Sequence, residues 1–108
     1  MKDHYPSEKF SAAVDTLATS PRLLQERIAD AFSHSLMLLI GNAAVPEDVK
    51  EKLAEYDAAW SSVEDVGAQG TISVWASGLS DDEAMDIATW IVEKAFELDR
   101  QYWTDEGA

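Results

Sequence analysis

The stretch PRLLQERIADAFSHSLMLLI, residues 21–40, decides the fold. Ser20 precedes Pro21, the order that a helix start favours, because a Ser hydroxyl accepts a free backbone N–H and Pro has no N–H to satisfy. Gly41 tolerates the left-handed conformation in which many helices end. The sequence therefore predicts one long helix over residues 21–40, about 30 Å long at the rise of an α-helix.

This predicted helix is amphipathic at its start and apolar all round in its last turn. Residues 36–40 are all apolar, and a helix that is apolar on every side is buried on every side. We therefore expect its C-terminal half to lie deep in the core, with other helices packed around it. Its broad apolar face consists of Leu24, Ile28, Ala31, Phe32, Ser35, Leu38 and Leu39.

Two shorter helices flank it in the sequence. The first is expected from about residues 6–8 to Ala18, because apolar residues recur there at helical spacing. Another is expected to begin at Pro46 and to end near Ser61, with acidic residues in its first turn, where the helix dipole favours them. Their apolar stripes are Phe10, Ala13, Val14 and Leu17, and Val49, Leu53, Tyr56, Trp60 and Val63.

Residues 64–70, EDVGAQG, are expected to form a loop because two glycines interrupt them. Residues 71–79 are ambiguous, since TISVW is rich in strand-forming residues while its apolar positions have helical spacing. A lone strand would leave its edge unpaired. We therefore expect a short helix here.

The last helix is expected from Asp81 to about Trp103. Ser80 and Glu83 form a capping box, in which each side chain satisfies a backbone N–H of the other residue. Its apolar positions fall on two stripes about 100° apart, which is wider than contact with one helix needs. The main stripe is Ala84, Ile87, Ala88, Ile91, Ala95, Leu98 and Tyr102, and the second is Met85, Val92, Phe96 and Trp103.

These elements predict an all-α protein, a compact bundle of four to five helices of which two are long. The length of 108 residues suits a single helical domain over 1–108, with 1–5 and 104–108 expected to be loose. The opening MKDHYPSEKF lacks the apolar segment of a signal peptide, and no apolar run is long enough to span a bilayer. We therefore expect a cytoplasmic protein that does not enter a membrane.

Composition excludes several classes of function. There is no Cys, so there is no disulfide, thiolate nucleophile or Cys-based metal site. The net charge of -13 argues against binding nucleic acid or an anionic membrane, because both require Lys and Arg to replace counterions. We find no motif for a cofactor and expect none. Solubility is the simplest reason for this charge, and mimicry of nucleic acid is an alternative.

Two polar groupings have simple structural explanations. Asp30 and His34 are four residues apart, as in half of a general-base arrangement, but a surface pair is the preferred explanation. Four acids at the start of the last helix could bind a divalent cation through oxygen ligands, yet the helix dipole already accounts for acids there. They are Asp81, Asp82, Glu83 and Asp86. We assign no catalytic or metal-binding residue.

The last helix offers the better candidate site, a protein-binding surface. Met85, Val92, Phe96 and Trp103 require a cover, which a second copy of the chain would supply as a two-fold homodimer meeting near Phe96 and Trp103. Trp90 lies off both stripes, among acidic residues. It is either exposed for contact with a partner or covered by another segment of the chain.

The predicted function is therefore that of a non-catalytic interaction protein, an adaptor or regulator, whose protein partner includes a second copy of itself. One alternative is an acidic nucleic-acid mimic that inhibits a DNA-binding protein. Another is a small metal-dependent enzyme that uses the carboxylates at helix starts.

Overall fold

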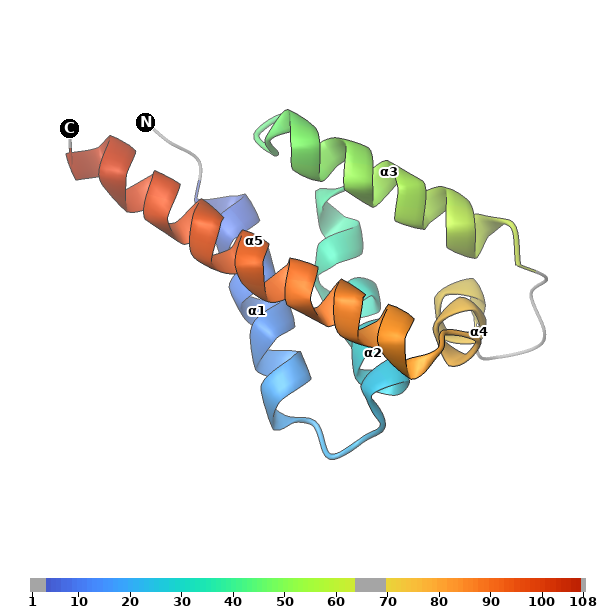
Figure 1. Ribbon diagram of the computed structural model, residues 1–108. Helices are drawn as coiled ribbons and strands as arrows, with labels where there is room; N and C mark the ends of the chain where they lie inside the picture. Colours follow the sequence, from blue (N-terminus) through green and yellow to red (C-terminus); the bar gives the residue numbers. More distant parts are fainter. Residues whose placement is uncertain (1–3, 64–69, 108) are drawn as a thin grey trace.

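Helix α5, Asp81–Gly107, is the longest element; α1 and α2 cross it on one side, and α3 runs along its flank (Figure 1). The computed structural model describes residues 4–63 and 70–107. Within these ranges the chain forms helices and turns and no strand, which confirms the all-α class. Before α5 come α1 (Tyr5–Thr19), α2 (Leu24–His34), the 3-10 helix η1 (Leu36–Leu39), α3 (Glu47–Ser61) and α4 (Gly70–Ser77).

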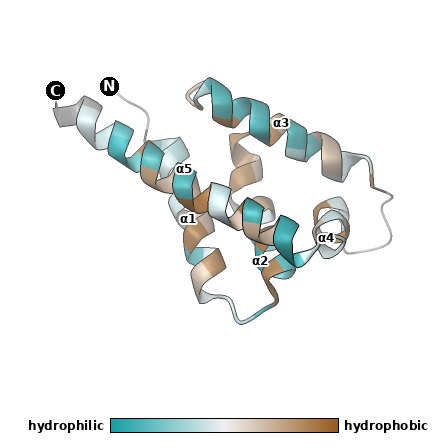
Figure 2. Cartoon of the chain, in the orientation of Figure 1, coloured by the Kyte–Doolittle hydropathy of each residue, from teal (hydrophilic) through white to brown (hydrophobic). Residues whose placement is uncertain are grey.

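The core lies where α1, α2 and α5 meet. The apolar stripe predicted for α1 points into it, as do Ile28 and Phe32 of α2 and Ala84 and Ile91 of α5. Apolar segments are prominent in α1 and α2, whereas α3 is mostly hydrophilic and α5 alternates between hydrophilic and apolar residues (Figure 2). The predicted stripes of α1 and α3 and the main stripe of α5 therefore supply most of the core. Val63 and Tyr102 are half-buried and lie outside it.

Six rings form a central aromatic cluster that attaches α3 and α4 to the rest of the fold. Each ring lies 5.1–5.8 Å, between centroids, from at least one other member, mostly in edge-to-face geometry. Such pairs add to the stabilisation that burial of the rings already provides. The cluster consists of Phe10 from α1, Phe32 from α2, Tyr56 and Trp60 from α3, Trp75 from α4 and Trp90 from α5.

The prediction of one helix over residues 21–40 is wrong at both ends. α2 begins only at Leu24, because the side chain of Glu26 accepts a hydrogen bond from the backbone N–H of Leu23 (3.4 Å) and fixes the first turn there. Arg22 bonds Glu26 at 2.9 Å and holds that carboxylate in place. Ser20 accepts a bond from the backbone N–H of Arg22 (3.3 Å) but does not cap the helix.

At the other end α2 stops at His34, and Ser35 leaves the helical conformation. The chain continues as η1, whose three residues per turn place Leu36 and Leu39 on one side. Both are buried, whereas Met37, Leu38 and Ile40 are exposed. The expectation that residues 36–40 would be buried on every side is therefore wrong, and Leu38 does not belong to the buried face of α2.

Other boundaries differ less. His4 is the N-cap residue of α1 and Tyr5 its first residue, so the helix begins within the segment expected to be loose. At the other end of the chain, α5 continues as a helix through residue 107, beyond the expected end at Trp103. Residues 70–77 form α4, so the ambiguous segment is helical as predicted. Within the loop expected over residues 64–70, residues 64–69 lie outside the described part of the chain. Gly70 takes a φ of 79° at the start of α4, a conformation that favours glycine.

Candidate protein-binding surface

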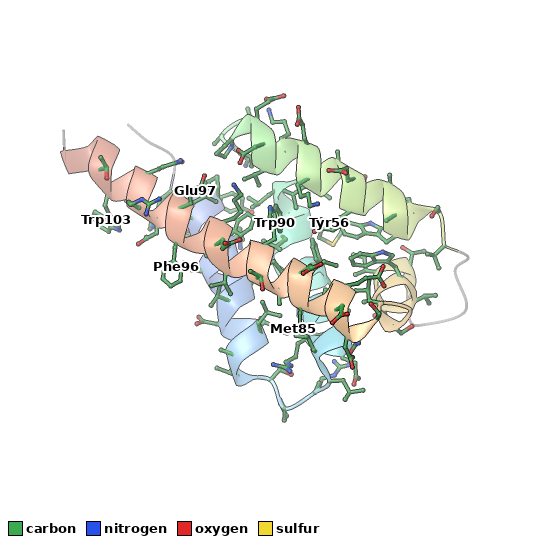
Figure 3. All side chains as sticks on the ribbon, viewed as in Figure 1. Tyr56, Met85, Trp90, Phe96, Glu97 and Trp103 are labelled. Carbon is green, nitrogen blue, oxygen red and sulfur yellow. The ribbon has the colours of Figure 1, made fainter. Side chains whose placement is uncertain are left out.

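The second stripe of α5 is exposed, and we call Met85, Val92, Phe96 and Trp103 the outer stripe. Phe96 is 71% exposed, Trp103 60% and Met85 56%, while Val92 is half-buried. At 100° per residue, all four fall within about 40° of one line along the helix, over a length of about 27 Å. Phe96 and Trp103 project from the same side of α5, and Glu97 from the other side (Figure 3).

Beside the outer stripe, α5 and α1 enclose an apolar groove, which we call the α1/α5 groove. It has two hollows that share Val14 and Val92. The larger, of about 410 Å³, reaches Met85 and Ala88, and the smaller, of about 220 Å³, reaches Phe96. Met85, Val92 and Phe96 thus border a recessed, mostly apolar surface, whereas Trp103 lines neither hollow.

A row of acids follows the outer stripe along α5, and we call Asp82, Asp86, Glu93 and Glu97 the acidic row. Helical spacing places it about 100° around α5 from the stripe. Within it, Glu97 accepts a hydrogen bond from Lys94 at 3.2 Å. Lys94 also donates to Asp48 of α3 at 2.7 Å, which lowers the pKa of that carboxyl and raises the pKa of the Lys94 ammonium.

Trp103 is held in place although it is exposed. Its indole Nε1–H donates to Asp99 at 3.2 Å, and its ring contacts Tyr102 edge-on, with 5.1 Å between centroids. Tyr102 in turn stacks on His4 at 4.1 Å, which ties the start of α1 to the end of α5. An aromatic side chain with a fixed rotamer loses little entropy when a partner covers it.

Trp90 is half-buried and belongs to the central aromatic cluster. Its ring lies 5.6 Å from Phe10 and 5.5 Å from Tyr56, both edge-on, and Figure 3 shows Trp90 and Tyr56 between α5 and α3. Of the two alternatives for Trp90, the structure supports a cover by other segments. Burial of the same cluster raises the pKa of Tyr56 to about 12, with smaller contributions from Glu55 and Asp86.

The polar pair predicted on α2 is not assembled as a general base. Asp30 accepts a hydrogen bond from Arg22 at 2.9 Å, and His34 is exposed. Arg27, one turn earlier, instead donates to the backbone carbonyl of Leu17 at 2.7 Å and so caps the last turn of α1. Arg22, Asp30 and Arg27 thus have structural contacts, and among the described residues the buried Nε of Arg27 has no hydrogen-bond partner.

Two of the four acids at the start of α5, Asp81 and Glu83, also have local partners. Glu83 accepts from the backbone N–H of Ser80 at 2.9 Å, Ser80 accepts from the N–H of Glu83 at 3.1 Å, and the predicted capping box is confirmed. Its backbone hydrogen bond lowers the pKa of Glu83. Asp81 accepts from Gln25 at 2.9 Å. Across residues 4–63 and 70–107, no three His, Asp or Glu side chains converge on a possible metal position.

The sequence did not predict the second exposed apolar patch, made by Met37, Leu38 and Ile40. An unbroken apolar run usually indicates burial, so the run itself predicted a buried segment. Ser35, a polar residue at the point where α2 ends, is the residue that could have indicated a change of conformation. This patch differs from the outer stripe, because η1 is short and presents no straight line of side chains.

Comparison of the chain with models of known protein families, with curated proteins and with solved structures finds no match. Among the described helices, none combines the length and the apolar character that a bilayer crossing requires.

Proposed function

We propose that this is a non-catalytic interaction protein, an adaptor or regulator, whose contact surface is the outer stripe of α5 and whose first partner is a second copy of the chain. The observation that supports this most is the exposure of three large apolar side chains along one straight line: Phe96, Trp103 and Met85. The cytoplasmic location expected from the sequence remains a prediction.

Burial of the outer stripe by a partner would be favourable in free energy. Full burial of a large apolar side chain stabilises by roughly 1.5–3 kcal/mol, and α5 leaves three such side chains mostly in water. Scattered apolar residues are normal on a surface, but large apolar side chains aligned beside an apolar groove are typical of an interface. Aromatic residues and Met are also the types enriched at the centres of interfaces.

The test is the molecular mass in solution, measured by light scattering over a range of concentrations. We expect the wild type to form a dimer at micromolar concentration and Phe96→Glu to remain a folded monomer. Leu23→Glu is a matched control, because Leu23 is 70% exposed and lies outside the stripe, and both changes add the same charge. Circular dichroism should show the same helix content in all three proteins.

A wild type that stays monomeric at high micromolar concentration would refute self-association. If Leu23→Glu dissociates the dimer as fully as Phe96→Glu does, the interface lies elsewhere or responds only to net charge. Loss of helix content in Phe96→Glu alone would assign Phe96 to the packing of the monomer.

Mimicry of nucleic acid is a second candidate, favoured by the arrangement of acids. Besides the acidic row, α3 carries exposed Glu47, Glu51 and Glu55, which are spaced about 6 Å apart along its axis. Lys50 and Lys52 interrupt this charge on α3. A mimic should compete with DNA for a basic DNA-binding protein, and its affinity should fall with rising salt. Replacing Glu47, Glu51 and Glu55 with Gln should abolish that competition. Unchanged competition would show that these three acids of α3 do not bind the DNA-binding protein.

A further inference from the structure

We propose that two copies of the chain pair through their α5 helices in antiparallel orientation, about a two-fold axis that passes the outer stripe at the level of residue 94 along the helix. This inference rests on the proposed function, because it uses the outer stripe as the contact surface. The stripe is symmetric in sequence about this position. Val92 and Phe96 lie two residues on either side of Lys94, and Met85 and Trp103 lie nine residues on either side.

This symmetry fixes the contacts. When a second α5 is turned end over end about residue 94, Met85 lies opposite the partner's Trp103, and Val92 opposite the partner's Phe96. The reciprocal pairs follow, as a two-fold interface requires. Each pair joins a smaller side chain to an aromatic one, and all four positions of the stripe are covered at once.

The α1/α5 groove is recessed where this register needs space. The partner's Trp103 would arrive at Met85 and Ala88, beside the larger hollow of about 410 Å³. The partner's Phe96 would arrive at Val92, beside the smaller hollow of about 220 Å³. Parallel pairing would instead bring the two Trp103 rings together, away from both hollows. The positions of the hollows and the opposed helix dipoles therefore favour the antiparallel orientation.

The area that the two copies can bury is large enough for a specific interface only if the α1/α5 groove is also covered. Phe96 and Trp103 are 71% and 60% exposed, so they offer on the order of 250 Å² per copy, at roughly 150–250 Å² for a whole aromatic side chain. A specific interface buries at least about 500 Å² per partner, and one of standard size about 800 Å². Met85, Val92 and the α1 side of the groove, with Val14 and Ala18, must supply the rest.

Charge opposes this pairing in part and predicts its salt dependence. Each copy has a net charge of -13, and the two Glu93 side chains would lie near the axis. Arg100 would fall about 7–8 Å along the helix from the partner's Glu93, within reach of an extended side chain. Because added salt screens the net repulsion, we expect dimerisation to strengthen as ionic strength rises.

Orientation can be measured directly with spin labels, because the chain has no Cys and any introduced Cys is unique. Asp82→Cys and Glu93→Cys place a nitroxide label outside the outer stripe. In the antiparallel dimer the two labels at 82 would be about 36 Å apart along the helix axis, whereas in a parallel dimer they would be separated only by the width of the helix pair. Labels at 93 would be close in either orientation.

We therefore expect a long distance at 82 from pulsed electron resonance, and strong dipolar broadening at 93, in samples whose mass is that of a dimer. A short distance at 82 together with broadening at 93 would refute the antiparallel register and leave self-association intact. If both labels show no intermolecular coupling and the mass is that of a monomer, the proposed function itself fails. A dimer without coupling at 93 would place the interface away from α5.

Discussion

Phe32 and Phe96 are the same residue in opposite environments. Phe32 is completely buried and contacts Tyr56, Trp60 and Trp75, whereas Phe96 is 71% exposed beside an apolar groove. The rings of the central aromatic cluster are thus covered by other side chains of the same chain, whereas most of the outer stripe remains exposed to water. This difference separates residues that hold the monomer together from those available to a partner, although both sets are aromatic and lie on amphipathic helices.

The largest effect is expected from Phe32→Ala. Removing this ring leaves a cavity among three other rings, and such changes lower the free energy of unfolding by about 3–5 kcal/mol. Urea denaturation followed by circular dichroism measures the loss. Phe96→Ala, examined at concentrations where the protein is monomeric, should lower the free energy of unfolding far less. Equal losses for the two variants would show that Phe96 stabilises the monomer as much as Phe32 does.

Tyr56 makes the cluster sensitive to alkaline pH. Its pKa is about 12 in the fold, above the value near 10 of an unfolded chain, so the folded state keeps the phenol proton to higher pH. Its contribution to stability is therefore complete below pH 10 and is lost as the pH rises through 12. Stability measured across this range should fall more steeply for the wild type than for Tyr56→Phe. Identical profiles would contradict the burial of this phenol.

The smallest effect is expected from Lys94→Met, which removes the ion pair between α5 and α3. Ion pairs at a protein surface contribute about 0–1 kcal/mol, and this pair is partly exposed, so α3 should stay in place through its aromatic contacts. The lowered pKa of Asp48 implies that the contribution of this pair is present above the unfolded-state pKa of that carboxyl and is lost as the pH falls through the folded-state value. Thermal melts at neutral and acidic pH measure it. A loss of several kcal/mol would show that the ion pair, rather than the cluster, holds α3.

Periodicity predicted the fold class, the capping of α5 by Ser80 and Glu83, and the separation of the two α5 stripes. These features depend on neighbours three or four residues apart, which a helical wheel displays. It failed at residues 36–40, because an apolar run is compatible with an α-helix and with a 3-10 turn, and the choice depends on which side chains the core can accept. Trp90 remained ambiguous because its cover comes from α1 and α3, through contacts that no local pattern records.

The outer stripe also gives a protein without cysteine a sulfur atom exposed to oxidants. Met85 is 56% exposed, and Met37 of the η1 patch is 41% exposed. Hydrogen peroxide would convert these thioethers to sulfoxides, which are polar and chiral. At Met85 the product would place a strong hydrogen-bond acceptor within an otherwise apolar line. The oxidation state of the Met85 sulfur would then set the polarity of the outer stripe. Reductases that act on methionine sulfoxide would restore the apolar thioether.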